Sequence, residues 1–304
     1  MSRRNRPYAL AAVATALALA SACSPGGADT PRADHDGREL AVPASARISS
    51  PPADERGLVP VIEPGMTPPN KKEEQFFTRG KVLDDIAAYA NTRIKVPGPI
   101  GIVATNCDEE NANWDSYRRQ IRFCYEFATK ARETYQQPDD KGRKPAAKEV
   151  DDSVAGFTNG VVFHELGHAL IDLYDLPTTG KEEDAVDQLS MLLLASSDAK
   201  HTGYAIDTIN AWGAFAAVDE TKDAGERLDQ YADEHSLNAQ RFYNWACWLY
   251  GSDPEAFESV VLSDSNPDGV LPGARAGNCK NEFNRISKAW TTLLKPYLKP
   301  QAAK

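Results

Sequence analysis

The chain has 304 residues, of which 41% are hydrophobic and 26% are charged, and this composition is typical of a folded protein with a sizeable core. Its formal net charge of −10 argues against a nucleic-acid partner, because phosphate binding requires a basic surface. We therefore expect neither DNA nor RNA among its partners.

The first 22 residues have the features of a bacterial secretory signal peptide. Three of residues 3–6 are arginine, residues 9–20 are apolar, and small residues follow. The apolar run is too short to span a membrane. Cys23 comes directly after the small residues, like the lipidated cysteine of a bacterial lipoprotein, although Ala20 stands where such signals usually have leucine. We expect a lipid on Cys23 to anchor the chain outside the bacterial cell membrane; plain secretion is the alternative.

Residues 23–70 are rich in proline, glycine, alanine, aspartate and arginine, and they show little apolar periodicity. Such a composition is typical of a flexible tether. We expect this tether to connect the lipid to a single folded domain of residues 71–304.

The folded part is predicted to place a small sheet before a mostly helical body. Apolar spacing in residues 81–92 indicates an amphipathic helix, and residues 100–104 and 120–125 have the pattern of strands, with a polar loop at 108–115 between them. After Lys148, helical spacing recurs in segments separated by glycine and proline, at residues 153–175, 181–197, 205–219, 235–250 and 280–296. Strands followed by helices indicate the α+β class.

The cysteine content fits an oxidising compartment. With Cys23 assigned to the lipid, an even number remains, which suggests two disulfides among Cys107, Cys124, Cys247 and Cys279. Three pairings are possible, and we favour the most local one, Cys107–Cys124 with Cys247–Cys279. No pair has the C-x-x-C spacing of a thiolate zinc site.

The clearest chemical signal is H-E-L-G-H at residues 164–168. On a helix, His164 and His168 project from one face about 5–6 Å apart, which suits two ligands of one tetrahedral zinc ion. Glu165 would sit beside the open coordination position, where it can accept a proton from water. The alternative is two histidines that merely share a helix face, but the apolar back of this helix favours the metal site. Gly167 weakens the helix and predicts a close approach by another backbone.

A third metal ligand must come from elsewhere in the chain. His201 and His235 are candidates, but Glu183 is better placed. Glu183 and Asp187 lie four residues apart on one predicted helix face, so Glu183 can bind zinc while Asp187 accepts the free N–H of a ligand histidine. The alternative is that these acids only stabilise the first turn of their helix.

Stabilisation of the transition state would also need a donor for the developing oxyanion. His235 is the best candidate, although a lone histidine at a helix start is often a cap or a surface residue. Three residues stand behind it as further candidates: Arg241, Tyr243 and Tyr174. Asp172, one turn after His168, is either an acceptor behind a ligand or a surface acid.

Two other patterns have structural explanations. Thr179 and Glu182 match a capping box, which gives Glu182 a role at the start of its helix. Four aromatic residues of the segment 235–250 are expected in the core: Phe242, Trp245, Trp248 and Tyr250.

The order His164, Glu165, His168, Glu183, Asp187 resembles the gluzincin metallopeptidases, of which thermolysin is the familiar example. Residues 107–296 resemble more closely a bacterial family described as "putative metallopeptidase" (DUF4344). The resembling stretches are N-A-N-W-D, I-R-F-C-Y-E, H-E-L-G-H-A-L-I-D-L-Y-D-L-P, E-E-D-A-V-D-Q, H-S-L-N-A-Q-R-F-Y-N-W-A-C-W-L-Y-G-S-D-P and L-P-G-A-R-A. They cover most of the folded chain and occur in order.

The resemblance implies a zincin-like fold and one zinc ion per chain, bound by His164, His168 and Glu183. It implies that Glu165 is the general base. One departure is the interval of fifteen residues between His168 and Glu183, which is shorter than in most gluzincins and bears on the identity of the third ligand.

The resemblance also implies that Asn111 and Ala112 hydrogen-bond an extended substrate. A strand at 118–125 with an open edge could accept such a peptide as an added strand. We therefore expect a monomeric zinc metallopeptidase, an endopeptidase that acts outside the membrane on peptide or protein substrates. The alternative is a catalytically inactive lipoprotein that uses the same fold as a binding module.

Overall fold

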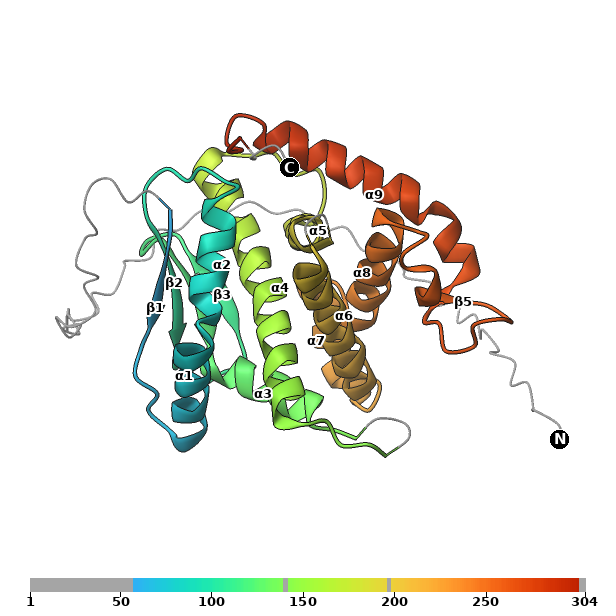
Figure 1. Ribbon diagram of the computed structural model, residues 1–304, viewed down its shortest axis with the longest axis horizontal. Coiled ribbons are helices and arrows are strands. Elements are labelled where there is room, and N and C mark those ends of the chain that lie inside the picture. The colour runs from blue at the N-terminus through green and yellow to red at the C-terminus, as the bar shows by residue number, and fades with distance from the viewer. Residues whose placement is uncertain (1–56, 139–141, 196–197, 301–304) are drawn as a thin grey trace, which may run out of the picture. The chain divides into compact units, whose positions relative to one another are not determined.

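The computed structural model describes residues 57–138, 142–195 and 198–300 (Figure 1). The predicted signal peptide, Cys23 and most of the predicted tether lie outside these residues. In the described part, a small sheet precedes a body of packed helices, so the predicted α+β class is confirmed.

The main sheet has the strand order β1–β2–β4–β3. Its strands are β1 (Leu58–Ile62), β2 (Ile100–Thr105), β3 (Ala112–Asp115) and β4 (Gln120–Cys124). The first three in that order run parallel, and β3 pairs antiparallel with β4. Strand β2, with the sequence I-G-I-V-A-T, is buried along its whole length, as expected for a central parallel strand covered on both faces.

The sheet corrects two predictions. The folded part begins earlier than residue 71, because residues 58–62 form β1 and pair with β2. The predicted open edge at 118–125 is wrong, because β4 has a partner strand on each side. The edge strand on this side of the sheet is β3, which comes from the segment predicted as a polar loop.

The helices pack against one another beside the sheet. They are α1 (Pro68–Gly80), α2 (Val82–Asn91), α3 (Tyr125–Tyr135), α4 (Ala147–Tyr174), α5 (Glu182–Ala195), α6 (Ala199–Asp219), α7 (Ala224–Ala232), α8 (Asn238–Ser252) and α9 (Gly273–Leu294). A short 3-10 turn (Glu258–Val260) and a small pair of strands, β5 (Val261–Leu262) and β6 (Leu271–Pro272), lie between α8 and α9. Each predicted helix is present, whereas α1, α3 and α7 were not predicted.

Helix α4 is the central element of the fold. It runs between the sheet and helices α5, α6 and α8, as Figure 1 shows. Its residues are buried almost without interruption from Val154 to Gly167, as expected for a helix surrounded by other elements. Gly156 and Gly160 allow α6 to pack closely against α4. A Cβ at position 156 would lie 2.3 Å from the side chain of Asp207, and a Cβ at position 160 would lie 2.2 Å from the side chain of Thr208.

Two disulfides link neighbouring elements. Cys107–Cys124 joins the loop after β2 to the end of β4, and Cys247–Cys279 joins α8 to α9. The favoured pairing is therefore confirmed.

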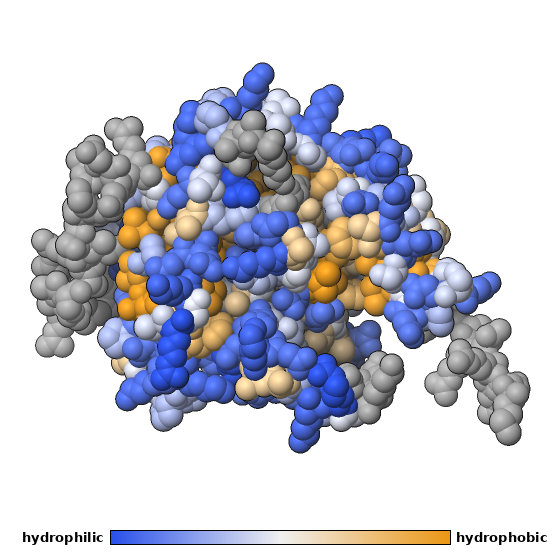
Figure 2. All heavy atoms as spheres, in the orientation of Figure 1, coloured by the Kyte–Doolittle hydropathy of each residue, from blue (hydrophilic) through white to orange (hydrophobic). Residues whose placement is uncertain are grey.

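The prediction that the aromatics of α8 belong to the core holds for Trp245 and Trp248, which are both buried. Among the described residues, no helix has the length and apolar character needed to cross a membrane. Figure 2 shows a largely hydrophilic face with apolar side chains gathered mainly over the sheet and over the region of α6, α8 and β5.

Candidate metal centre

Helix α4 carries both histidines of the H-E-L-G-H stretch. The ring centroids of His164 and His168 are 5.0 Å apart, and the two residues lie one turn apart on one face. Only 4% of the surface of His164 is exposed. The helix is therefore a rigid and largely desolvated support for the two imidazoles.

Gly167 explains how α5 reaches these histidines. A Cβ atom at Gly167 would lie 2.6 Å from the Cβ of Val186, which is too close for two side chains. The predicted close approach to this helix is confirmed, and its partner is Val186 of α5. Because Val186 packs against Gly167, the neighbouring Glu183 and Asp187 face the histidines of α4.

The carboxylate of Glu183 lies at the centre of the cluster. Its Oε2 atom is 3.0 Å from Nε2 of His164 and 3.0 Å from Nε2 of His235. Its Oε1 atom is 3.3 Å from Nε2 of His168. Although it is buried, Oε2 makes no well-aligned hydrogen bond with any described residue. Three imidazole nitrogens therefore converge on the two oxygens of one carboxylate.

A second layer of groups orients His164. Nδ1 of His164 lies 2.8 Å from Oδ1 of Asp187, so the Nε2 atom is directed at Glu183. Asp187 is held in turn by Arg241, whose Nε and Nη2 atoms donate to its two oxygens over 2.8 and 2.7 Å. The guanidinium group of Arg241 stacks on the ring of Trp212, 3.6 Å from its centroid. The expected acceptor role of Asp187 thus agrees with its position.

Glu182 orients the other histidine. Its Oε1 atom lies 2.7 Å from Nδ1 of His168. The predicted capping box of Thr179 and Glu182 is wrong, because α5 begins at Glu182 and its carboxylate faces His168 instead. Each α4 histidine therefore has a carboxylate behind its Nδ1 atom and Glu183 in front of its Nε2 atom.

The carboxylates of the cluster stay ionised and favour positively charged partners. Burial lowers the pKa of His168, but its hydrogen bonds with Glu183 and Glu182 outweigh this and raise the pKa to about 9. Burial raises the pKa of the Glu183 carboxyl, whereas the surrounding imidazoles hold that pKa far below its usual range. Burial likewise raises the pKa of Asp187, but Arg241 and His164 outweigh it and keep the group ionised.

Glu165 lies beside the cluster and does not take part in its ion pairs. It lines the same cavity as His164 and His235, and 6% of its surface is exposed. Burial raises the pKa of Glu165, and the nearby histidines offset this only in part. A carboxylate in this environment is a stronger proton acceptor than an exposed one.

His235 enters the cluster from the loop before α8. Its Nδ1 atom lies 2.9 Å from Oδ1 of Asp233, and its ring stacks parallel to that of His164 with 6.0 Å between the centroids. Ser236 fixes this loop to α5, because its hydroxyl donates to Asp184 over 2.6 Å. The contact with Glu183 raises the pKa of His235, so the protonated form that can donate from Nε2 is favoured.

Comparison with protein families agrees with this geometry. A family model described as "putative metallopeptidase" (DUF4344) matches residues 63–294. The chain belongs to this family. No curated protein and no solved structure matches the chain.

The donor set of this DUF4344 member fits a zinc ion. Imidazole nitrogens and carboxylate oxygens are zinc ligands, and one donor atom each from His164, Glu183 and His235 lies within 4.8 Å of the others. The unsatisfied Oε2 of Glu183 is the atom that a cation would engage. A second group of close donors includes Cys107 and Cys124, but both sulfurs are in a disulfide and cannot bind metal.

The structure places the remaining predicted site residues as follows. Asn111 and Ala112 lie at the start of the edge strand β3 and line the cavity that also contains His164. His201 lies at the start of α6, where it pairs with Asp198 and stacks on Tyr89.

The further candidates for the oxyanion donor, and Asp172, make other contacts. Arg241 reaches the cluster through Asp187. The hydroxyl of Tyr174 donates to the carbonyl of Lys95, and the side chain of Tyr243 is exposed. Asp172 accepts a hydrogen bond from the indole of Trp114 in β3 over 2.9 Å, so it ties the edge strand to α4.

Sequence reasoning missed the acceptors behind two of the three imidazoles. Asp233 stands two residues before His235, and a D-x-H spacing of this kind is a usable signal for an oriented histidine. Glu182 is adjacent to the predicted ligand Glu183, and helix spacing alone does not direct it toward His168.

Proposed function

We propose that the protein is a zinc metallopeptidase in which His164, His168 and Glu183 hold one metal ion and Glu165 is the general base. The observation that carries the proposal is the convergence of three imidazole Nε2 atoms on the partly buried Glu183 carboxylate, with Glu165 alongside. A zinc ion held there would supply Lewis acidity, which polarises a peptide carbonyl and makes water more acidic.

Glu165 is suited to the proton transfers of hydrolysis. In its ionised form it accepts a proton from the attacking water, and it then passes that proton to the nitrogen of the leaving amine. Because burial raises its pKa, both transfers are better matched than they would be with an exposed carboxylate.

His235 supplies the donor that the developing oxyanion requires. Asp233 accepts from Nδ1 of His235, which leaves Nε2 directed toward the centre of the cluster. In this role His235 does not hold the metal, although its Nε2 atom is as close to Glu183 as that of His164. The variant His235→Ala distinguishes the two roles. If His235 is the oxyanion donor, the variant keeps the metal and loses activity. If His235 is a metal ligand, the variant also loses the metal.

The decisive experiment compares Glu165→Gln with the unchanged protein on a mixture of peptides, using mass spectrometry to detect cleavage. We expect hydrolysis to fall by about a hundredfold or more while the zinc content stays the same. Glu255→Gln removes the same charge at an exposed position and should alter neither. Cleavage that survives Glu165→Gln would contradict the assigned base, and zinc binding without any cleavage by the unchanged protein would favour the binding-module alternative.

We further propose that the enzyme works outside the cytoplasmic membrane, anchored by a lipid on Cys23. The signal-like residues 1–22 support this, and so do the two disulfides, since disulfides persist in oxidising compartments. Cys23→Ser should move the protein from the membrane fraction to the soluble fraction of cells that express the full chain. An unchanged distribution would contradict the anchor.

A further inference from the structure

Helix α9 presents a positively charged face on the outside of the molecule. The exposed cations of this basic face are Lys280, Arg285, Lys288 and Lys295. At about 100° per residue, their side chains start within about 140° of one another around the helix axis. The helix contains one acid, Glu282, which is already bound by Arg275 and by the indole of Trp248. The basic face therefore contains cations and no acid.

The cations of the basic face lack ionic partners among the residues that the structure describes. Other exposed cations, such as Lys148 and Lys200, pair with acids on the same surface. Within the described part of α9, only Arg275 forms an ion pair, and its partner is Glu282. The charges of the basic face are therefore available to an external partner.

The packing of α9 fixes the direction of the basic face. The opposite side of the helix is buried, and its buried residues are Ala276, Cys279, Phe283, Ile286, Trp290 and Leu294. The disulfide Cys247–Cys279 ties this side to α8, and the indole of Trp290 donates to the carbonyl of Ala185 in α5 over 3.1 Å. In Figure 1, α9 runs along the outer edge of the helical body. The basic face is thus held toward solvent and cannot turn inward to reach an acid.

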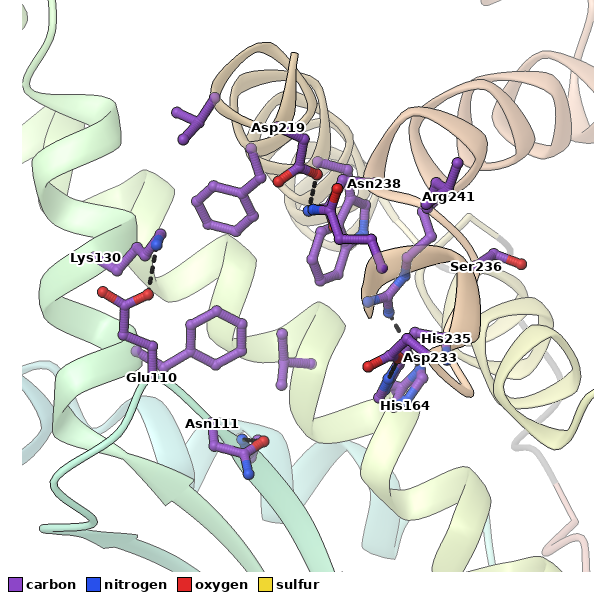
Figure 3. Close-up of a pocket in the computed structure, with 18 of the residues that line it drawn as sticks. Glu110, Asn111, Lys130, His164, Asp219, Asp233, His235, Ser236, Asn238 and Arg241 are labelled. Carbon is purple, nitrogen blue, oxygen red and sulfur yellow. Dashed lines mark hydrogen bonds and ion pairs between the residues drawn. The ribbon is translucent and has the colours of Figure 1, made fainter. Parts of the chain in front are cut away.

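The basic face stands out in a chain that is acidic as a whole. The formal net charge is −10, and residues 219–234 alone contain seven acids and two bases, a net charge of −5. Two acids of this acidic segment, Asp219 and Asp233, line the cavity beside the candidate metal centre, where Figure 3 shows them. Figure 1 shows that α7, which belongs to the acidic segment, is well separated from α9. Positive and negative charge therefore lie in different regions of the molecule.

We propose that the basic face docks on a membrane surface that contains anionic phospholipid headgroups. Charge complementarity carries the proposal, because each lysine or arginine close to such a surface adds to the attraction. Helix α9 has no exposed large apolar side chain, so the contact is with the headgroups and involves no insertion into the acyl chains. The inference rests on the proposed lipid anchor on Cys23, which would keep the chain within reach of the membrane.

Docking through α9 orients the candidate metal centre. The headgroups that attract the basic face repel the acidic segment, so the cavity lined by Asp219 and Asp233 turns away from the membrane. Four cations give only weak attraction that salt screens. The basic face therefore orients a chain that is already anchored and does not hold an unanchored chain on the membrane.

The test measures co-sedimentation of the mature chain with vesicles, using Cys23→Ser so that the chain carries no lipid. One set of vesicles contains phosphatidylglycerol and phosphatidylcholine in equal amounts, and the other contains phosphatidylcholine alone. We expect binding to the anionic vesicles only, and we expect it to disappear as the salt concentration rises from about 0.01 M to about 1 M. Equal binding to both sets, or no binding to the anionic set at low salt, would overturn the proposal.

A variant of the basic face tests where the membrane binds. It combines Lys280→Gln, Arg285→Gln, Lys288→Gln and Lys295→Gln, and it should bind the anionic vesicles at least about tenfold more weakly. The matched control removes the same charge from exposed positions outside α9, by Lys71→Gln, Lys72→Gln, Arg79→Gln and Lys144→Gln. The control should keep its affinity within about threefold. Circular dichroism checks that both variants are folded, and an equal loss of binding in both would overturn the assignment to α9.

The acidic segment of a second copy of the chain is the competing partner for the basic face. Light scattering without vesicles distinguishes the two. A monomeric mature chain supports the membrane, whereas a dimer that the variant of the basic face dissociates would overturn it. The anchor is tested separately by the fractionation of Cys23→Ser cells, and the peptidase by Glu165→Gln. Neither result depends on α9, so failure of the basic face leaves both proposals standing.

Discussion

Asp187 lies 2.8 Å from Nδ1 of His164, and both side chains are buried. The contact fixes the tautomer of the imidazole and directs Nε2 at Glu183, and such a contact would strengthen His164 as a ligand in the proposed metal site. Asp187→Asn should weaken zinc binding by about 10- to 100-fold, measured by competition with a chromophoric chelator.

The control for Asp187 is Asp152→Asn, an exposed change on α4 that should not affect the metal. Because Asp187→Asn also leaves Arg241 with a weaker partner, the thermal stability of the metal-free protein must be recorded in parallel. Zinc affinity that is unchanged in a folded Asp187→Asn protein would contradict the orienting role.

Gly167 tests whether the distance between α4 and α5 controls the site. A methyl group at this position meets Val186, so Gly167→Ala should displace α5 and carry Glu183 away from the histidines. We expect a loss of about 1–3 kcal/mol of unfolding free energy and a lower zinc content. Gly180→Ala, where a Cβ meets no other atom within 4 Å, is the matched control. A Gly167→Ala protein with normal stability and full zinc occupancy would show that the close packing is not required.

Asp207 gives the protein a pH-dependent stability that is separate from the metal centre. Burial raises the pKa of Asp207 from 3.8 to about 6, so the folded chain favours its protonated form. The free energy of unfolding should therefore fall as the pH rises from about 4 to about 6 and stay lower above that range, by at most about 3 kcal/mol.

The variant Asp207→Asn should remove this dependence. It should unfold at a higher temperature than wild type at pH 7.5 and at a similar temperature at pH 4, whereas the exposed change Asp229→Asn should follow wild type throughout. Parallel curves of unfolding free energy against pH for Asp207→Asn and wild type would refute the assignment.

The disulfide Cys247–Cys279 joins α8, which carries Arg241, to α9. Replacing both cysteines with alanine should lower the unfolding free energy by about 2–4 kcal/mol, because the unfolded chain gains freedom in the loop of 32 residues. Chemical denaturation measures the change, and reduction of wild type, which also breaks Cys107–Cys124, should lower the unfolding free energy at least as much. A double variant as stable as wild type would contradict a stabilising role.

The sequence predicted the part of the site that depends on local spacing. His164 and His168 share a helix face whatever the rest of the fold does, and Glu183 and Asp187 follow the same rule on α5. The disulfide pairing was also accessible, because the most local pairing was the correct one.

The contacts that depend on tertiary packing could not be predicted from the sequence. β3 is a four-residue strand of half-buried residues, and only its pairing with β4 makes it the edge of the sheet. β1 contains Pro60 and follows a proline-rich stretch, so its sequence resembles the tether until its pairing with β2 is known. Glu182 bonds to His168 because Gly167 sets the distance between α4 and α5, and no helix pattern reports that distance. The zincin-like assignment of the fold remains a prediction.

The proposed zinc site is tested most directly by the metal content of the purified protein, measured by elemental analysis beside His164→Ala, Glu183→Ala and the distant control His201→Ala. We predict about one zinc per chain in wild type and in His201→Ala, and none in the other two. Full zinc in Glu183→Ala would remove Glu183 from the ligand set and favour His235 in its place. No zinc in wild type after reconstitution would contradict the metal centre itself.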